Sequence, residues 1–421
     1  MDAPSSADSK PAASATRSVG MILFLVGAVQ FVNILDFMMV MPLGPDFAAD
    51  LGMPLSHLGW IGGSYTASAA VAGILGSTFL DRFDRRKALA LAMLGLVTGT
   101  VLGGMARGFG SLMFARILAG AFGGPATSLS LSIVSDVVPP ERRGRALGWV
   151  MAAFSAASVL GVPLSLVLSR VGGWRSPFFA VGGIGFLVTA CALWMMPPMV
   201  KHLEAKSRSA TGALELLARP TVLLALTSML VTMGSLFLVI PNFSSFLQHN
   251  LQYPRDHLEG LYVIGGLVSF AMNRLVGGWV DRFGSPLLAT IGTALSSCAL
   301  LFGFVTDPVL FAPAATFILF MAAGSFRGVA LNALTSKVPA PHERARYMST
   351  QSAVQHLASA GGAMSGSLFL TELPSGIVDG MRPVCLASLL IGLLLPFFAW
   401  RLSKSVNAAP DGGAPLKAEG T

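Results

Sequence analysis

The stretch Leu80-Asp81-Arg82-Phe83-Asp84-Arg85-Arg86-Lys87-Ala88-Leu89 separates two long apolar runs in the first quarter of the chain. A shorter copy, Gly277-Gly278-Trp279-Val280-Asp281-Arg282-Phe283-Gly284, follows 200 positions later. Charged loops between apolar runs are typical of the short connections between membrane-spanning helices. The repetition predicts that the chain consists of two related halves.

The composition is that of a membrane protein. Of the 421 residues, 53% are hydrophobic and 11% are charged, whereas soluble domains carry about 25% charged residues. A soluble protein of this length could not cover its surface with so few charges. Because helices satisfy their backbone hydrogen bonds internally in a bilayer, the composition predicts an all-α protein that crosses the membrane many times.

Apolar runs long enough to span a bilayer, which takes at least about 18 residues, occur twelve times. They cover 19–42, 57–80, 87–106, 111–136, 145–169, 174–197, 219–247, 258–280, 286–305, 309–336, 346–370 and 381–402. The predicted fold is therefore an all-α membrane protein with twelve transmembrane helices in two pseudo-symmetric six-helix bundles.

The duplication also predicts the domain boundaries. The bundles are expected at 18–198 and 219–403, with a polar cytoplasmic linker at 199–218 between them. The polar ends, 1–17 and 404–421, predict disordered cytoplasmic tails. Two duplicated halves with a binding site between them near the middle of the membrane are typical of transporters.

The basic residues are unevenly distributed between the loops. With the N-terminus inside, twenty Lys and Arg residues fall on the inner side and five on the outer side. The positive-inside rule then places both termini in the cytoplasm, as in a multi-pass protein of a bacterial inner membrane. The same distribution accounts for the net charge of +8 without a nucleic-acid partner, because the basic residues lie in short loops and not along one face.

From about Ser18 to Leu402 the chain resembles the major facilitator superfamily. The family's first loop has a small residue, three others, Asp-Arg, and then Gly-Arg-Arg or Gly-Arg-Lys, and here it is Ser77-x-x-x-Asp81-Arg82-Phe83-Asp84-Arg85-Arg86. Ser77 and Asp84 replace the usual glycines, which the second copy keeps as Gly277 and Gly284.

Two further motifs resemble those of exporters in this family. Arg116-x-x-x-Gly120-x-x-x-Gly124 resembles the arginine motif of proton-driven members. Gly161-x-Pro163, followed by Gly173-Trp174-Arg175, resembles the exporter motif of the bacterial sugar- and drug-efflux branch, although Ser165 and Ser169 replace its second glycine pair.

The resemblance implies a cytoplasmic gate. In the family, the Asp81 position caps the start of the eleventh span, here 346–370. The Arg85 position pairs with an acid at the inner end of the fourth span, here 111–136, and that acid is Asp136 in this sequence. The residues expected in this gate are Asp81, Arg82, Arg85, Asp136, Asp281 and Arg282. The alternative is that the arginines only anchor the loops on the inner side. That alternative leaves Asp81 and Asp136 without a role, because acidic residues do not anchor loops on the inner side, and this favours the gate.

Asp36 is the acidic residue deep inside the first apolar run. A charge at the centre of a membrane helix costs at least about 2.5 kcal/mol, so such residues are usually functional. At 1.5 Å per residue, Asp36 lies about 27 Å from Ser18 and Arg116 about 8 Å from the outer surface, so the two side chains can meet. A nearby guanidinium favours the ionised form of an aspartate side chain, whereas burial favours its neutral, protonated form. We therefore expect Asp36 to carry the proton and Arg116 to tune it, the alternative being a static ion pair.

Polar side chains in other spans predict a substrate cavity. Gln30 and Asn33 precede Asp36 at three-residue steps, and Phe243 offers an apolar wall. The residues expected to line this cavity are Gln30, Asn33, Asn242, Phe243, Arg327, Asn332, Gln351 and Gln355. The alternative is that the polar residues only bond neighbouring helices, at about 0.6 kcal/mol each, and Arg327 is left open between an anionic substrate group and a backbone carbonyl.

These features predict a proton-coupled exporter of small, drug-like or sugar-like organic molecules. The chain contains no phosphate-binding loop and no zinc-protease or serine-hydrolase motif, so no enzyme activity, metal or cofactor is expected, and the proton gradient supplies the energy. The expected partners are the lipid bilayer, protons and a small-molecule substrate, with the protein as a monomer. The rivals are an uptake symporter or facilitator of the same fold, and a membrane sensor or channel.

Overall fold

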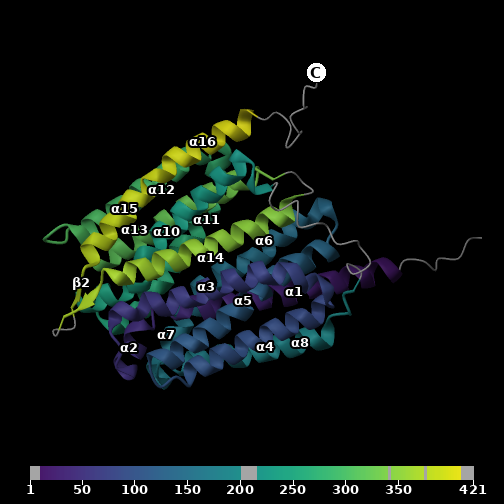
Figure 1. Ribbon diagram of the computed structural model, residues 1–421, viewed down its shortest axis with the longest axis horizontal. Coiled ribbons are helices and arrows are strands. Elements are labelled where there is room, and N and C mark those ends of the chain that lie inside the picture. Colours follow the sequence, from purple (N-terminus) through teal and green to yellow (C-terminus); the bar gives the residue numbers. More distant parts are fainter. Residues whose placement is uncertain (1–9, 201–215, 340–342, 374–376, 409–421) are drawn as a thin grey trace, which may run out of the picture.

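The computed structural model describes residues 10–200, 216–339, 343–373 and 377–408. The long helices run side by side in one bundle (Figure 1). Helix α1 (Lys10–Met39) begins and helix α16 (Leu394–Ala408) ends at the same end of this bundle, which we call the terminal end. Helix α2 (Gly44–Leu51) and the hairpin of β1 (Thr371–Glu372) and β2 (Val378–Asp379) lie at the opposite end, the hairpin end.

The first half contains α1 and α2 and the helices that follow them up to residue 195. After the 3₁₀ turn Leu55–His57 these are α3 (Leu58–Phe79), α4 (Arg85–Gly104), α5 (Phe109–Val137), α6 (Pro140–Ala156), the π-helical turn η3 (Ala157–Gly161), α7 (Val162–Gly172) and α8 (Ser176–Met195). Helix α1 starts at Lys10, before the predicted boundary at 18, in a segment that contains several alanines, the residue with the highest helix propensity. The predicted linker lies mostly outside the described residues.

The second half repeats this arrangement. It contains α10 (Pro220–His249), the 3₁₀ turn η5 (Arg255–His257), α11 (Leu258–Phe283), α12 (Ser285–Leu300), the π-helical turn η6 (Leu301–Val305), α13 (Pro313–Thr335), α14 (Arg344–Leu368), the β1–β2 hairpin, α15 (Met381–Gly392) and α16. Its helices lie beside those of the first half, in teal to yellow against purple to blue (Figure 1).

The predicted fold class is confirmed. Among the described residues, eleven segments are long and apolar enough to cross a membrane. The remaining predicted span, 346–370, forms helix α14 (Arg344–Leu368), which is less apolar because it carries polar residues such as Gln351, Ser352 and Gln355. Since α14 packs along α3 of the first half and α10 of the second, it is an interior helix.

The two halves meet along two seams. One is formed by α3 and α14, and the other by α11 against η3 and α7. At the second seam the backbones of the two halves approach each other closely, since a Cβ at Gly266 of α11 would lie 2.9 Å from the carbonyl oxygen of Ser158. Any site between the halves therefore lies between these two seams.

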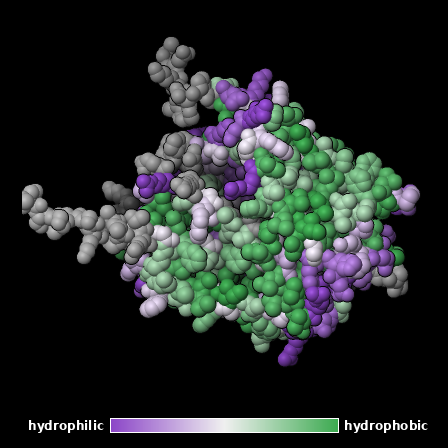
Figure 2. All heavy atoms as spheres, turned by 180° about the vertical axis from the view of Figure 1, so that it is seen from behind, coloured by the Kyte–Doolittle hydropathy of each residue, from purple (hydrophilic) through white to green (hydrophobic). Residues whose placement is uncertain are grey.

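The outer surface has an apolar band. Figure 2 shows hydrophobic residues across the middle of the molecule and hydrophilic residues gathered toward its two ends. Large apolar side chains are exposed on several helices, among them Phe114, Phe186, Trp194 and Leu390. Exposed apolar surface of this extent is expected to contact lipid.

Candidate functional site

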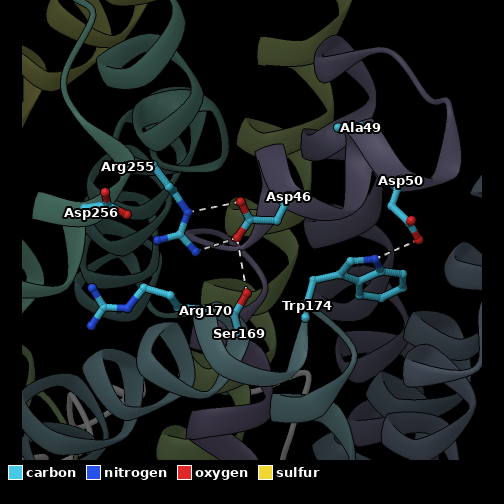
Figure 3. A pocket seen from close by; sticks show the side chains of 9 residues that line it. Asp46, Ala49, Asp50, Ser169, Arg170, Trp174, Arg255 and Asp256 are labelled. Atoms are coloured by element: carbon cyan, nitrogen blue, oxygen red, sulfur yellow. Dashed lines mark hydrogen bonds and ion pairs between the residues drawn. The ribbon is translucent and has the colours of Figure 1, made fainter.

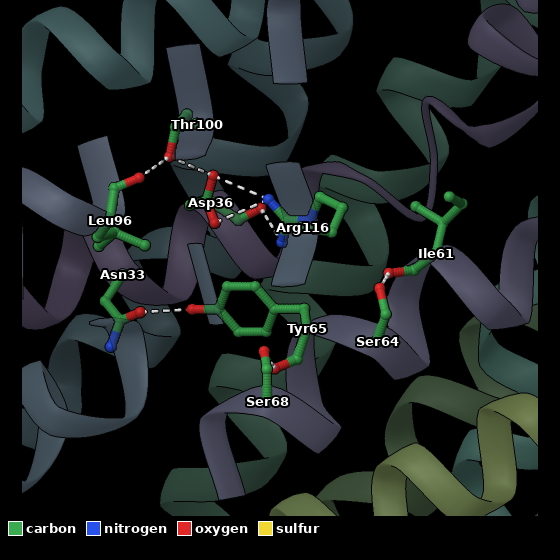
Figure 4. A network of polar contacts seen from close by, with 9 residues as sticks. All are labelled: Asn33, Asp36, Ile61, Ser64, Tyr65, Ser68, Leu96, Thr100 and Arg116. Atoms are coloured by element: carbon green, nitrogen blue, oxygen red, sulfur yellow. Dashed lines mark hydrogen bonds and ion pairs between the residues drawn. The ribbon is translucent and has the colours of Figure 1, made fainter. Parts of the chain in front are cut away.

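The first half contains a fully buried ion pair. Asp36 of α1 is 0% exposed and Arg116 of α5 is 1% exposed, and their charged groups lie 2.9 Å apart. Arg116 Nη1 donates to both carboxylate oxygens, and Arg116 Nη2 donates to the Asp36 carbonyl oxygen at 3.3 Å. The Thr100 hydroxyl of α4 donates to Asp36 Oδ1 at 2.7 Å (Figure 4). The structure thus brings together the two residues that the depth estimate predicts to meet.

The environment of this pair makes its charges costly to separate. Removing one partner of a buried ion pair typically costs about 3–5 kcal/mol, because the other charge is left unpaired. Arg116 Nε has no hydrogen-bond partner in the part of the chain that the structure describes. Asp36 is therefore the main compensation for the Arg116 charge.

Tyr65 of α3 connects this pair to a second group of polar side chains. Its ring centroid lies 4.5 Å from the Arg116 guanidinium carbon, and its hydroxyl donates to Asn33 Oδ1 at 2.6 Å. Asn33 Nδ2 donates to the Gly123 carbonyl oxygen and, at 2.7 Å, to the Thr127 hydroxyl. Four helices, α1, α3, α4 and α5, thus hold one continuous set of polar contacts (Figure 4).

The arginine motif accounts for the close packing around this set. A Cβ at Gly120 would lie 2.1 Å from the carbonyl oxygen of Tyr65, so α3 approaches α5 where only glycine fits. Residues at four-residue spacing share one helix face, which places Arg116 on the face of α5 that the glycines turn toward α3. The motif therefore positions the guanidinium against the Tyr65 ring.

Two predicted cavity residues belong to this buried set. Asn33 is 5% exposed and Gln30 is 2% exposed. The Thr127 hydroxyl donates to Gln30 Oε1 at 3.3 Å. Their partners all lie in the first half, and a contact of either residue with substrate stays a prediction.

The predicted cavity residues of the second half are more scattered. Phe243 packs in a ring cluster with Phe304, Phe317 and Phe320, and Asn242 is 0% exposed with no partner for its amide among the described residues. Arg327 is 2% exposed, and its one hydrogen bond among the described residues goes to the Ser235 hydroxyl at 2.6 Å. The structure does not join these residues in one cluster.

The remaining three predicted cavity residues are less buried. Asn332 is exposed, and Gln351 is half-buried on α14. Gln355 is exposed, and its amide nitrogen lies 3.7 Å from the sulfur of Met233 on α10. Gln351 and Gln355 share a face of α14, as their spacing predicts.

The predicted gate is formed in part. Arg85 Nε lies 2.6 Å from Asp136 Oδ2, which is the pairing that the family resemblance implies. Both residues belong to the first half, so this pair holds α4 to α5. Arg82, Asp281 and Arg282 are exposed, and the Asp81 side chain lies outside the described part of the structure.

Asp84, which replaces a glycine of the family's loop, has a definite local role. It caps α4 by accepting from the Arg86 backbone N–H at 3.0 Å and also accepts from the Met199 backbone N–H at 2.9 Å. The charged stretch therefore ties the start of α4 to the chain that follows α8.

The exporter motif forms an irregular turn at the seam between the halves. Pro163 lacks the N–H that would continue the α-helical hydrogen bonds, and the preceding residues Ala157–Gly161 are π-helical. Gly161 is buried against Leu35 of α1, where a Cβ would lie 2.6 Å from a methyl carbon. The same π turn receives Gly266 of α11 from the second half.

Two ion pairs join the halves at the hairpin end, and the sequence patterns do not predict them. Arg255 Nε donates to Asp46 Oδ1 at 3.0 Å, and a second guanidinium nitrogen contacts Asp46 Oδ2 (Figure 3). Arg170 Nη2 lies 2.9 Å from Glu259 Oε2. Asp46 and Arg170 come from the first half, and Arg255 and Glu259 come from the second. We call these two pairs the outer latch.

A surface hollow of about 610 Å³ lies beside the outer latch. Asp50 lines it and accepts from the Trp174 indole N–H at 2.9 Å (Figure 3), and also from Arg175. The Trp174 bond first and the Arg175 guanidinium second hold the pKa of Asp50 below its usual value. The hollow is lined by Asp46, Ala49, Asp50, Ser169, Arg170, Gly173, Trp174, Arg255 and Asp256.

The fold and the buried ion pair define a class of protein, the polytopic membrane transporters of two six-helix halves. The comparisons identify the family, because residues 26–363 match the Major Facilitator Superfamily. The chain belongs to this superfamily.

Its curated relatives are distant. Inner membrane transport protein YdhP of Escherichia coli K12 is 26% identical over 239 residues, which cover 56% of this chain and 60% of YdhP. Purine ribonucleoside efflux pump NepI of Escherichia coli O6:K15:H31 is 27% identical over 269 residues, 63% of this chain and 66% of NepI.

Solved structures confirm the fold. A D-xylose-proton symporter superposes with a TM-score of 0.74 at 18% identity, over 94% of this chain and 100% of that chain. A bacterial homolog of the human lysosomal transporter Spinster, in an inward-facing and unoccupied conformation, gives a TM-score of 0.73 at 18% identity, over 97% and 100%.

Sequence reasoning does not identify several residues that the structure brings to the site. Tyr65 is the one tyrosine of the first half, in a span of small residues, and that isolation is a usable signal. Thr100 and Thr127 give no such signal, because Thr and Ser occur throughout the spans. Asp46 and Arg255 lie 209 residues apart, and their pairing follows only from the folded structure.

Proposed function

We propose that this protein is a secondary active transporter that exports small organic molecules in exchange for protons. The observation that carries the proposal is the Asp36–Arg116 pair, which is fully buried in a membrane bundle. A buried carboxylate that holds one guanidinium can exist as the ion or, with a proton bound, as the neutral acid. Ionisable groups inside membrane helices are typical of proton pathways.

The proposed cycle alternates between two arrangements of the halves. A proton binds the Asp36 carboxylate from one side, neutralises it and weakens its hold on Arg116, and the proton leaves on the other side after the halves rock. The terminal end faces the cytoplasm in this proposal, as the positive-inside count supports. The outer latch, with both pairs across the halves, then closes the opposite side.

Export is favoured over uptake by the irregular turn η3 between α6 and α7. The π-helical segment Ala157–Gly161 before Pro163 corresponds to the motif that resembles those of exporters. Two relatives agree with this direction in part, since one is named an efflux pump and the other a transport protein. An uptake symporter remains the rival, because the fold is shared with a proton symporter.

Everted membrane vesicles test the proposal. A growth screen with toxic dyes, drugs and sugar analogues first supplies a transported compound, and its uptake is then measured with the vesicle lumen acidified. We expect uphill uptake by the wild type and by Asp50→Asn, which alters an exposed acid at the hairpin end. Asp36→Asn should lose uphill uptake but keep downhill exchange, because the neutral amide fixes the site in one charge state.

Three results would overturn the proposal. Full proton-driven accumulation by Asp36→Asn would show that the coupling lies elsewhere. Accumulation by the wild type only when the proton gradient is reversed would identify a symporter. Conductance without saturable exchange would indicate a channel.

A further inference from the structure

An unbroken series of side-chain contacts leads from the buried ion pair to the second half. The Arg116 guanidinium lies 4.5 Å from the centroid of the Tyr65 ring. The Tyr65 ring stacks on Phe37, with centroids 5.3 Å apart and planes at 27°. Phe37 in turn stacks on Phe237 of α10, with centroids 5.9 Å apart and planes at 28°. We call these four side chains the aromatic relay.

The start of the aromatic relay is rigid. Tyr65 is 3% exposed, and its hydroxyl is fixed by Asn33 at 2.6 Å. Phe37 follows Asp36 directly in α1, so the carboxylate and the ring that meets Tyr65 sit on one backbone segment. A shift of the guanidinium relative to Asp36 therefore acts on Tyr65 and Phe37 together.

The end of the relay is at the boundary between the halves. Phe37 belongs to the first half and Phe237 to the second, and both are half-buried. The outer latch also joins the halves, but it lies at the hairpin end, beyond the turn after α1. The relay is thus the contact between halves that begins at the proposed proton site.

The charge on Asp36 determines what holds Arg116. While Asp36 is ionised, its two oxygens take the hydrogen bonds of Arg116 Nη1. Once Asp36 is neutral, the Tyr65 ring becomes the main attractive side chain for the guanidinium, through the cation–π contact. The charged and titratable groups that face Asp36 are Arg116 of α5 and Tyr65 of α3, and Thr100 of α4 adds a neutral hydroxyl.

We propose that Tyr65 and Phe37 are positioning residues that transmit the protonation state of Asp36 to the second half through Phe237. This inference rests on the proton-coupling role proposed for Asp36. The rings change their stacking when Arg116 moves, and the Phe37–Phe237 contact then favours one arrangement of the halves. The competing explanation is that the three rings only fill space.

Distance measurements between the halves separate these explanations without a substrate. With the three native free cysteines replaced by serine, spin labels at Ala49→Cys and Gln252→Cys place one label on each half at the hairpin end, where both residues are exposed. Pulsed electron resonance on the full chain in lipid nanodiscs then gives the fractions with the hairpin end closed and open. The range from pH 5 to 8.5 keeps exposed aspartates ionised, since their usual pKa is about 3.9.

We expect the open fraction of the doubly labelled wild type to change across this range, and Asp36→Asn to abolish the change. Tyr65→Leu and Phe37→Leu should abolish it too, because each removes a ring while Asp36 remains. Tyr65→Phe should keep it, since the ring remains. Phe302→Leu is the matched control and should also keep it, because the Phe302 ring contacts Phe311 in the second half, at a tilted angle, and takes no part in the aromatic relay.

Each outcome decides between the two proposals. A wild-type pH response in both Tyr65→Leu and Phe37→Leu overturns the relay and leaves the role of Asp36 intact. A wild-type response in Asp36→Asn overturns the proton-coupling role itself. If Tyr65→Leu does not fold, Phe37→Leu decides alone, because Phe37 takes no part in the buried polar contacts.

Discussion

Breaking the outer latch should open the hairpin end. Asp46 is held by two nitrogens of Arg255, and both side chains are about a quarter exposed, at 25% and 27%. A hydrogen bond to a charged group contributes about 1.5–3 kcal/mol, and partial exposure favours the lower part of that range. Asp46→Asn should therefore cost the closed arrangement about 1.5–2 kcal/mol, a roughly 10- to 30-fold change in the closed-to-open ratio.

The label pair at Ala49 and Gln252 measures this ratio directly. Glu259→Gln should act in the same direction but more weakly, because its partner Arg170 is 52% exposed. Glu259 also acts electrostatically on Arg255, so the two pairs are coupled, and the shift in the double variant should depart from the sum of the two free energies. Arg382→Gln is the control, since Arg382 pairs with Asp307 inside the second half.

An unchanged ratio in Asp46→Asn would refute this reasoning. It would mean that the tight seam of α3 and α14 alone keeps the hairpin end closed. An Asp46→Arg change should open the hairpin end further than Asp46→Asn, because it places two guanidinium groups together, and Arg255→Asp should restore closure in that background.

Three further predictions concern stability. Arg327→Gln should keep or raise the melting temperature in detergent, because glutamine can still bond Ser235 and no buried guanidinium remains; a fall of several degrees would indicate an anionic partner. Gly266→Val should destabilise by about 1–3 kcal/mol, because its Cβ would lie 2.9 Å from the Ser158 carbonyl oxygen, whereas Gly260→Ala meets nothing within 4 Å and should be neutral. Because the pKa of Asp50 is lowered in the folded protein, its carboxylate stabilises the fold at pH values above the usual pKa of aspartate, and this stabilisation is lost as the pH falls through the lowered pKa. Asp50→Asn should therefore make the stability depend less on pH at acidic pH.

The sequence is informative about features that depend on one helix at a time. Span length and composition predict the helices, and the depth of Asp36 and Arg116 within their spans predicts that they meet, as the structure shows. These inferences work because the rise per residue is constant and a bilayer has a fixed thickness. The fold and the ion pair therefore follow from local rules.

Contacts between segments that are distant in the chain cannot be predicted from the sequence by these local rules. Gln351 and Gln355 share a face of α14, but the sequence does not show which neighbour that face meets. From its position in the helix, Phe243 could line a cavity or pack in the hydrophobic core. Its contacts with the rings of Phe304 and Phe317 show that it packs in the core. The aromatic relay and the outer latch are not predicted for the same reason, since Phe37 and Phe237 are far apart in the chain and Asp46 and Arg255 lie 209 residues apart.

The charged stretch at Asp84 and Arg85 has a role that its repetition alone does not reveal. Arg85 pairs with Asp136 of the same half, and Asp84 binds the backbone N–H of Met199 beyond α8. Both described ion pairs between the halves belong instead to the outer latch. Rocking requires each half to stay rigid while contacts between the halves break. A stretch that ties α4, α5 and the end of the first half together supplies that rigidity at the terminal end, so the proton-dependent changes at Asp36 act on whole halves and not on single helices.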